Sequence, residues 1–445
     1  MRIPYALCFA PFVSATAPPS NTIVSIKSGT TNVDVRQLPQ MLGNHVPDRE
    51  IASFLETARI TTLEYVHSQV VETSRLTIDS DALCNFITMA SHKLALQSDC
   101  AVDAMGESYG QVDSDLHVND PDARYQKHLK WMEMGEVWQL ALPHVTRKVK
   151  VAVLDSGIDW TDPDFAPLKG TLRTKGGRYI DGGWNFVTNS PTLTNVCAHG
   201  TNVCKILAAK GNNSVGVVGV ALNTILQPLQ VIDDQGSLLL SRFLEAIDMA
   251  IDLEVDIISA SLGFNLSSHD LAEQHLLWNA LHAVQENGII LVSSAGNDFK
   301  VASDVYPCWF GGPSGICVAY LFDYMWDNRT EAVFNTQSNY GDRVDVAAYG
   351  TQLVTGRDKN GHLMKFSGTS AAQPIVAGLA AILLSMGIEP TMVKQLMLAN
   401  VDPVGCEVPD MFPQYIPGGA INALRLVQHA VSLLPSRSRG LRRSE

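Results

Sequence analysis

Several features that would define a class of protein are scarce or missing in this sequence. Basic residues are outnumbered, with 32 Lys and Arg against 45 Asp and Glu, and the formal net charge is −13. A nucleic-acid-binding domain should instead be basic, so we expect no nucleic-acid partner. Beyond the N-terminus no stretch reaches the ~18 consecutive apolar residues of a membrane-spanning helix, so no span is expected. We find no internal repeat.

Cysteine is also scarce, with eight residues and no CxxC pair, which argues against a cysteine metal site. Cys8 falls in the N-terminal segment discussed next, and the seven others are an odd number, so at least one thiol is free or pairs elsewhere. These seven are Cys84 and Cys100 in the N-terminal region, the possible disulfides Cys197–Cys204 and Cys308–Cys317, and the left-over Cys406.

Residues 1–17, MRIPYALCFAPFVSATA, resemble a secretory signal peptide. Arg2 gives the charged start, residues 3–13 are mostly apolar, and small residues near Ala17 offer a cleavage site. We therefore expect a secreted protein, and an N-terminus that stays in the cytosol is the alternative.

Residues 18–118 are expected to form a smaller α+β unit, with a strand at 23–26 and helices at 47–68 and 81–96. The unit ends in a polar stretch rich in Asp and Gly, which is typical of an exposed linker. A pro-segment with a linker that can be cut fits a secreted protease, and a separate binding domain is the alternative.

From residue 119 to 435 short apolar runs alternate with helical patterns. Such alternation predicts an α/β fold with a largely parallel sheet flanked by helices. The clearest helices are expected at 240–251 and 369–386, and residues 436–445 form a basic tail that we expect to be disordered. The apolar runs expected as buried strands are 149–154, 224–231, 255–260, 289–294, 316–320 and 344–348.

Three residues in this region supply an acid, a base and a hydroxyl, the parts of a serine nucleophile. Asp155 closes a buried strand, His199 begins a helix in the string CAHGTNV, and Ser370 lies among small residues in FSGTSAAQP. Gly200 should let another backbone approach His199. Asn297, after another buried strand, is a candidate donor to an oxyanion.

Each of the four candidates also has an ordinary structural interpretation. Asp155 could cap a helix and His199 could be a core histidine. Ser370 could belong to a helix-packing motif, and Asn297 to an Asn-Asp turn. Their order, and their shared position at strand–helix junctions, favours the catalytic interpretation. The order acid, base, nucleophile is that of the subtilisin type, which other serine triads do not share.

The motifs VAVLDSGID, HGT, GNNSVGVVGVA, ISASLG, SSAGN and GTSAAQPIVAG resemble those of the subtilisin family of serine endopeptidases, in the same order. The resemblance extends from residue 119 to residue 427. It implies substrate-binding segments on either side of an extended peptide, which would bind through main-chain hydrogen bonds. The substrate-binding residues that it implies are Gly236, Ser237, Ser261, Leu262, Gly263, Ser294, Ala295 and Gly296.

The same resemblance implies a structural calcium ion at the GNNSVGVVGVA loop, because calcium prefers carboxylate, amide and carbonyl oxygens. An ordinary loop tightened by Asn and Gly is the alternative. The ligands implied are Asp120, Asp164, Gly211, Asn213, Val215 and Val217.

Three positions depart from the family pattern. Asn202 stands where His is usual, Ala371 where Met follows the nucleophile, and Leu238 where Gly is often found. None removes a catalytic group, but Leu238 leaves the substrate preference open.

Together these features predict a secreted, monomeric, calcium-stabilised serine endopeptidase that acts on proteins or peptides. The resemblance implies a zymogen whose pro-segment inhibits it and is cut near residues 112–119. The main alternative is a catalytically impaired subtilisin fold that serves as a binding module. An esterase usually shows GxSxG with its Ser first, so that class is disfavoured.

Overall fold

The computed structural model describes residues 21–63, 68–72, 78, 80–102, 113, 115–267, 269–322, 332–405 and 418–435. The predicted signal peptide, most of the predicted linker, the basic tail, Cys8 and Cys406 lie outside these ranges. The chain divides into two compact units, Met1–Ser108 and Tyr109–Glu445.

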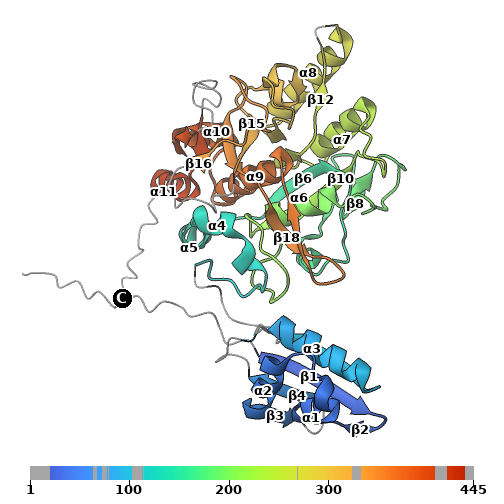
Figure 1. The fold of residues 1–445 in the computed structure, drawn as a ribbon. Coiled ribbons are helices and arrows are strands. Elements are labelled where there is room, and N and C mark those ends of the chain that lie inside the picture. Colours follow the sequence, from blue (N-terminus) through green and yellow to red (C-terminus); the bar gives the residue numbers. More distant parts are fainter. Residues whose placement is uncertain are drawn as a thin grey trace, which may run out of the picture. The chain divides into compact units, whose positions relative to one another are not determined.

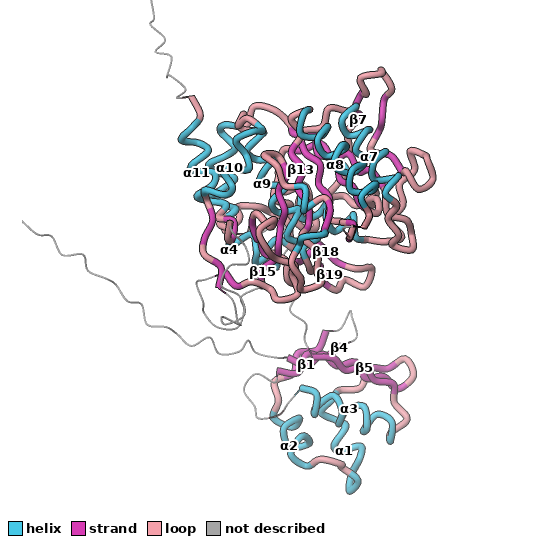
Figure 2. Tube along the Cα trace, turned by 90° about the horizontal axis from the view of Figure 1, so that it is seen from above, coloured by secondary structure: helices cyan, strands magenta, loops and turns pink. Residues whose placement is uncertain are grey.

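The N-terminal unit packs helices against one face of an antiparallel sheet (Figure 2). Its core gathers buried side chains such as Val24, Leu55 and Phe86. The strands are β1 (Asn21–Ser28), β2 (Thr31–Asn32), β3 (Ile60–Leu63), β4 (Ser68–Glu72) and β5 (Gln97–Val102), and the helices are α1 (Leu38–Leu42), α2 (Arg49–Thr57) and α3 (Ser80–Lys93).

Two of the three elements predicted for this unit are found, at β1 and α3. The helix expected at 47–68 is wrong beyond Thr57, because α2 ends there and residues 60–63 form β3. This strand has the sequence ITTL, whose β-branched residues suit a pleated sheet, and it pairs with β4.

The second unit is built on a nine-stranded sheet in the order β20-β22-β17-β15-β13-β11-β6-β10-β9. Its strands β6 and β10 lie side by side in Figure 1. Neighbouring strands are parallel except β20 and β22. The strands are β6 (Val149–Asp155), β9 (Trp184–Asn185), β10 (Thr224–Gln230), β11 (Ile257–Ala260), β13 (Ile290–Ser294), β15 (Gly315–Leu321), β17 (Val346–Tyr349), β20 (Val401–Asp402) and β22 (Ala420–Ile421).

All six predicted apolar runs are strands of this sheet, which confirms the expected α/β fold. Alternate side chains face two different cores. On β6, Val151 and Val153 join the core of α6 and α9, while Ala152 and Leu154 join that of α7 and α8. The helices are α4 (Lys127–Trp131), α5 (Met134–Ala141), α6 (His199–Ala208), α7 (Leu240–Asp252), α8 (Leu271–Glu286), α9 (Thr369–Ser385), α10 (Pro390–Ala399) and α11 (Ala423–Leu433).

Short strand pairs lie outside the main sheet. They are β7 (Thr171–Arg173) with β8 (Tyr179–Asp181), β12 (Phe264–Asn265) with β14 (Val305–Tyr306), β16 (Ala332–Val333) with β21 (Val404–Gly405), and β18 (Leu353–Arg357) with β19 (Leu363–Phe366). None of the helices in the described ranges is long and apolar enough to cross a membrane.

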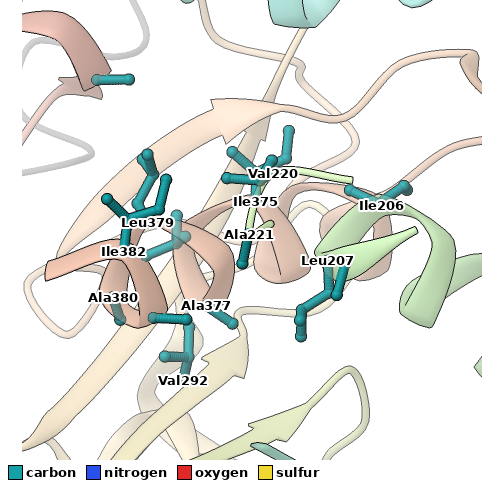
Figure 3. Packing of buried hydrophobic residues seen from close by; sticks show 14 of the residues in the cluster. Ile206, Leu207, Val220, Ala221, Val292, Ile375, Ala377, Leu379, Ala380 and Ile382 are labelled. Atoms are coloured by element: carbon teal, nitrogen blue, oxygen red, sulfur yellow. The ribbon is translucent and has the colours of Figure 1, made fainter. Parts of the chain in front are cut away.

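Helix α9 is almost wholly buried and is the centre of the larger core. Figure 3 shows Ile375 and Ala380 of α9 gathered with Ile206 and Leu207 of α6 and with Val292 of β13. This packing fixes the start of α9 with respect to α6 and to the strand ends.

The division between the units falls upstream of the predicted boundary at 118. Leu116 and Val118, expected in an exposed linker, are each 1% exposed and belong to the core of the second unit. Asp113 and Asp115 also form ion pairs with Lys130 in α4, at 2.9 and 3.2 Å. Residues 115–118 are therefore part of the larger unit.

Among the described residues there are two disulfides, Cys84–Cys100 between α3 and β5, and Cys308–Cys317, one of the two possible bridges. The possible Cys197–Cys204 bridge is not formed, since both are free thiols. The stretch 199–204 is helical and rises about 7.5 Å. A disulfide joins Cα atoms only ~4.4–6.8 Å apart.

Candidate active site

Asp155 and His199 are in direct contact at the carboxyl edge of the sheet. Asp155 ends β6, and His199 is the first residue of α6. His199 Nδ1 lies 2.8 Å from Asp155 Oδ1 and 3.0 Å from Oδ2. The Asp155 side chain is 1% exposed, against 28% for His199. A buried carboxylate thus holds one ring nitrogen, and the other is available for proton transfer.

Close backbone packing makes this contact possible. A Cβ atom on Gly200 would lie 2.2 Å from the Gly157 carbonyl oxygen and 3.0 Å from Asp155 Oδ1. The Gly200 N–H donates to Ser156 Oγ, which donates to the Cys197 carbonyl. The expectation that Gly200 permits a close backbone approach is confirmed.

Asp155 also sets the acid–base properties of His199. Burial by itself lowers the pKa of His199, but the charge and the hydrogen bond of Asp155 outweigh it. The pKa of His199 therefore lies above its ordinary value.

Ser370 lies in the first turn of α9, after Gly368 at φ 110°. Its hydroxyl donates to the Ser261 carbonyl oxygen at 3.3 Å, so the proton is not directed at His199 in this conformation. The His199 ring packs edge-on against Phe366, with centroids 5.1 Å apart. Catalytic hydrogen bonds often tighten only when substrate binds, and this geometry is compatible with such a change.

Asn297, which follows β13, has its side-chain oxygen engaged by the start of α9. Asn297 Oδ1 accepts hydrogen bonds from Thr369 N at 2.9 Å and from Thr369 Oγ1 at 3.1 Å. These two donors fix the orientation of the amide beside Ser370. The Nδ2 group is then the end that can donate to a ligand.

Gln373 is a positioning residue that the motifs did not single out. It is fully buried, and its Oε1 accepts from Ser259 Oγ at 3.1 Å and from Ser261 Oγ at 2.7 Å. Its Nε2 donates to the Val292 carbonyl at 3.0 Å. The sequence signal that could have found Gln373 is a large polar side chain in a largely apolar helix, because such a side chain requires hydrogen-bond partners.

The two expected walls of a substrate pocket follow adjacent parallel strands. Ser261, Leu262 and Gly263 come directly after β11, while Ser294 ends β13 and Ala295 and Gly296 follow it. The second segment is braced by Asn339, which donates from Nδ2 to the Ala295 carbonyl at 2.9 Å. Both segments lie at the carboxyl edge that carries Asp155 and Asn297.

Gly236 and Ser237 are exposed and lie in a turn rather than in a strand of the main sheet. Asp233 Oδ1 accepts the Ser237 N–H at 2.8 Å, and Ile232 forms an isolated antiparallel bridge with Leu238. This turn follows β10, the neighbour of β6.

The residues expected at a calcium site come together around residues 211–217. Asp120 accepts the backbone N–H groups of Asn212 and Asn213, and Asp164 Oδ2 accepts that of Val217 at 3.1 Å. Burial, with the charge of Asp164 adding to it, raises the pKa of Asp120 to about 6. Burial also raises the pKa of Asp164, against the opposing charge of Lys205.

The donor set at this loop does not fit calcium, which needs six to eight oxygens directed at the ion. Each carboxylate oxygen of Asp120 and Asp164 already accepts a hydrogen bond from nitrogen. Asn213 presents Nδ2 to Asp164 at 3.0 Å, while its Oδ1 accepts the Val215 N–H. The Lys205 ammonium lies 3.4 Å from Asp164 Oδ2.

Comparison with known proteins agrees with the fold. Residues 146–412 match the Subtilase family, which is more than half of the chain. The chain therefore belongs to this family of subtilisin-like serine endopeptidases.

Two curated relatives illustrate the similarity. Thermophilic serine proteinase of Bacillus sp. (strain AK1) is 32% identical over 255 residues, 57% of this chain and 57% of that protein. Thermitase of Thermoactinomyces vulgaris is 30% identical over 281 residues, 63% of this chain and 88% of that protein. The chain thus spans little more than half the length of the first relative.

A solved protease structure from Pseudoalteromonas arctica PAMC 21717 has the same fold. The TM-score is 0.53 at 24% identity, over 70% of this chain and 99% of that chain.

Proposed function

We propose that this protein is a secreted serine endopeptidase, made as a zymogen, that hydrolyses peptide bonds through Asp155, His199 and Ser370. The observation that carries the proposal is the Asp155–His199 contact of 2.8 Å at the sheet edge where α9 presents Ser370. Family membership supports the same chemistry.

In this mechanism the Ser370 hydroxyl first breaks its hydrogen bond to the Ser261 carbonyl oxygen. Its oxygen attacks the carbonyl carbon of the scissile bond, and its proton moves to His199 Nε2. Asp155 holds Nδ1 and stabilises the imidazolium. His199 then gives the proton to the leaving amine as the C–N bond breaks. Water then attacks the acyl-enzyme as Ser370 attacked the substrate. The bond between the acyl group and the Ser370 oxygen breaks, and the Ser370 hydroxyl is regenerated.

Negative charge develops on the substrate oxygen when Ser370 attacks. Asn297 Nδ2 and the Ser370 N–H are the proposed donors to this oxyanion. Thr369 engages Asn297 Oδ1, so Nδ2 is oriented before substrate arrives. Removal of such a donor in a subtilisin lowers turnover about 100- to 1,000-fold.

An extended peptide is the substrate that suits this site. The segments 261–263 and 236–238 both follow strands at the catalytic edge, and main-chain groups there can pair with a peptide backbone. Backbone pairing favours broad specificity. Residues 294–296 form the opposite wall of the proposed primary pocket.

The N-terminal unit is the proposed pro-segment and intramolecular inhibitor, preceded by a signal peptide at 1–17. It has its own sheet, core and disulfide, which supports a self-contained unit. The processed enzyme is proposed to be a monomer that acts outside the cell on proteins or peptides. Structural calcium is general in this family, but the proposed mechanism draws on no metal.

A catalytically impaired fold that only binds peptides is the alternative. Labelling by a fluorophosphonate probe separates the two, with Ser370→Ala as the matched control. We expect labelling and self-processing of the full chain, and neither in the variant. A folded protein that is processed by an added protease but never labelled would refute the catalytic proposal.

A further inference from the structure

Lys205 is a buried cation beside the 211–217 loop. It extends from α6, the helix that begins at His199, and its side chain is 6% exposed. Its ammonium lies 2.6 Å from Asp162 Oδ2 and 3.4 Å from Asp164 Oδ2. A buried lysine is rare unless it is paired, so these two carboxylates account for its position.

Phe165 and Gly356 also lie near the Lys205 ammonium. The Phe165 ring centroid is 5.8 Å from Lys205 Nζ. A Cβ atom at Gly356 in β18 would lie 3.2 Å from Nζ, and Gly356 has a φ of 124° that favours glycine. An aromatic ring and a backbone segment therefore also lie close to the charge.

The 211–217 loop is also hydrogen-bonded to Asp164. Asn213 Nδ2 donates to Asp164 Oδ1 at 3.0 Å and Val217 N donates to Oδ2 at 3.1 Å. A Cβ atom on Gly216 would lie 2.3 Å from Asp164 Oδ2, so the backbone wraps tightly around it. Asp164 is thus shared by the loop and by Lys205.

We propose that the Lys205 ammonium is the resident cation of the 211–217 loop and takes the place of the calcium ion that family membership implies. A calcium ion on Asp164 would face a like charge in a poorly solvated site, where repulsion is strong. The loop is then held by a covalently attached charge, and its stability does not depend on calcium. The inference does not rest on the proposed catalytic function.

The test uses the full chain with Ser370→Ala, so that self-digestion cannot obscure unfolding. Its Tm is measured by differential scanning calorimetry in calcium and in EDTA, and calcium binding is titrated by calorimetry. We expect no binding at the loop, and no fall of Tm in EDTA that depends on the loop. The added Lys205→Met change should lower Tm by roughly 5 °C or more, because it leaves the buried Asp164 carboxylate without its cation.

Lys169→Met is the matched control, since Lys169 forms an exposed pair with Asp181 at 2.9 Å. It should change Tm by about 1 °C or less. If Lys205→Met fails to fold, the combined Lys205→Met and Asp164→Asn changes should recover a folded protein by removing both charges.

Asp120→Ala, which removes both side-chain oxygens, locates any calcium effect. A Tm that falls in EDTA, with this fall abolished by Asp120→Ala, would overturn the proposal. So would a Lys205→Met variant that is no less stable than Lys169→Met. A calcium effect that persists in Asp120→Ala lies outside the loop and agrees with the proposal.

Discussion

Ser261 donates a hydrogen bond of 2.7 Å from its hydroxyl to the side-chain oxygen of Gln373. Ser261 also accepts the Ser370 hydroxyl at its main-chain carbonyl. Its hydroxyl also lies 3.2 Å from the Ser370 carbonyl oxygen, so three hydrogen bonds join the strand end after β11 to the start of α9. Placement of Ser370, the proposed nucleophile, depends on Ser261 and Gln373 as well as on the helix itself.

Gln373→Leu should misplace Ser370. We expect kcat to fall about 10- to 100-fold with KM nearly unchanged, because small displacements of a reacting group are costly. Stability should also fall, by roughly 1–3 kcal/mol, since two buried hydroxyls lose their partner. Steady-state kinetics on a peptide substrate and denaturant unfolding measure the two effects.

Gln227→Leu is the control for this substitution. Gln227 is equally buried, in β10, but neither of its amide atoms has a hydrogen-bond partner among the described residues. Its replacement should leave kcat unchanged and keep or raise stability. An equal loss of kcat in both variants would show that Gln373 only contributes to packing.

The His199–Asp155 contact predicts the pH dependence of activity. In the proposed mechanism neutral His199 accepts the Ser370 proton, so kcat/KM should fall in acid with a midpoint above 6.5, the ordinary histidine value. Asp155→Asn should lower this midpoint and reduce kcat by about 10⁴-fold, as in a comparable triad. A midpoint that does not move in Asp155→Asn would contradict the assignment.

The same shift contributes to stability with a defined sign. A raised pKa means that folding favours the protonated form of His199. This contribution is complete below the unfolded pKa near 6.5 and is lost as pH rises through the higher folded value. Unfolding of Ser370→Ala between pH 5 and 9, with and without Asp155→Asn, would measure it.

Gly200→Ala should damage the site and the fold together. The new methyl group would lie 2.2 Å from the Gly157 carbonyl oxygen, so α6 must move away from the end of β6. We expect a loss of roughly 1–3 kcal/mol in stability and weak labelling by the fluorophosphonate probe.

Gly176→Ala provides the comparison, because a Cβ atom there meets only Thr174 Oγ1 at 3.7 Å. It should label normally and unfold like the parent. Normal labelling of Gly200→Ala would show that α6 can shift without disturbing the proposed catalytic residues.

Processing should separate the units upstream of Asp113. Leu116 and Val118 are core residues of the larger unit, so a cut between 115 and 119 would remove part of its packing. N-terminal sequencing of the processed protein should find a start before residue 113. A start at Asn119 would mean that this core segment is dispensable, and Leu116→Ala would then leave Tm unchanged.

Much of the site could be predicted because its residues follow recognisable strand ends. Asp155, Asn297 and Ser261 lie at one edge of the sheet because their strands are adjacent and parallel. Parallel strands with apolar runs are the strongest signal in such a sequence.

The partners of individual side chains could not be predicted in this way. Lys205 meets Asp162, and Gln373 meets Ser259, only after the chain between them has folded. A motif gives the type of residue and its position along the chain, while a buried polar residue reveals only that some partner is needed. Cys197 and Cys204 do not form a disulfide, and their closeness in the sequence did not reveal that a helix begins between them.

Both disulfides close within a single unit, Cys84–Cys100 in the smaller and Cys308–Cys317 in the larger. One backbone cut between the units therefore leaves no covalent tether among the described residues. If the smaller unit is the inhibitor, as proposed, its release after cleavage would be governed by its dissociation constant and by dilution, and neither of these two disulfides would have to be reduced. Activation would then respond to protein concentration and to destruction of the freed segment.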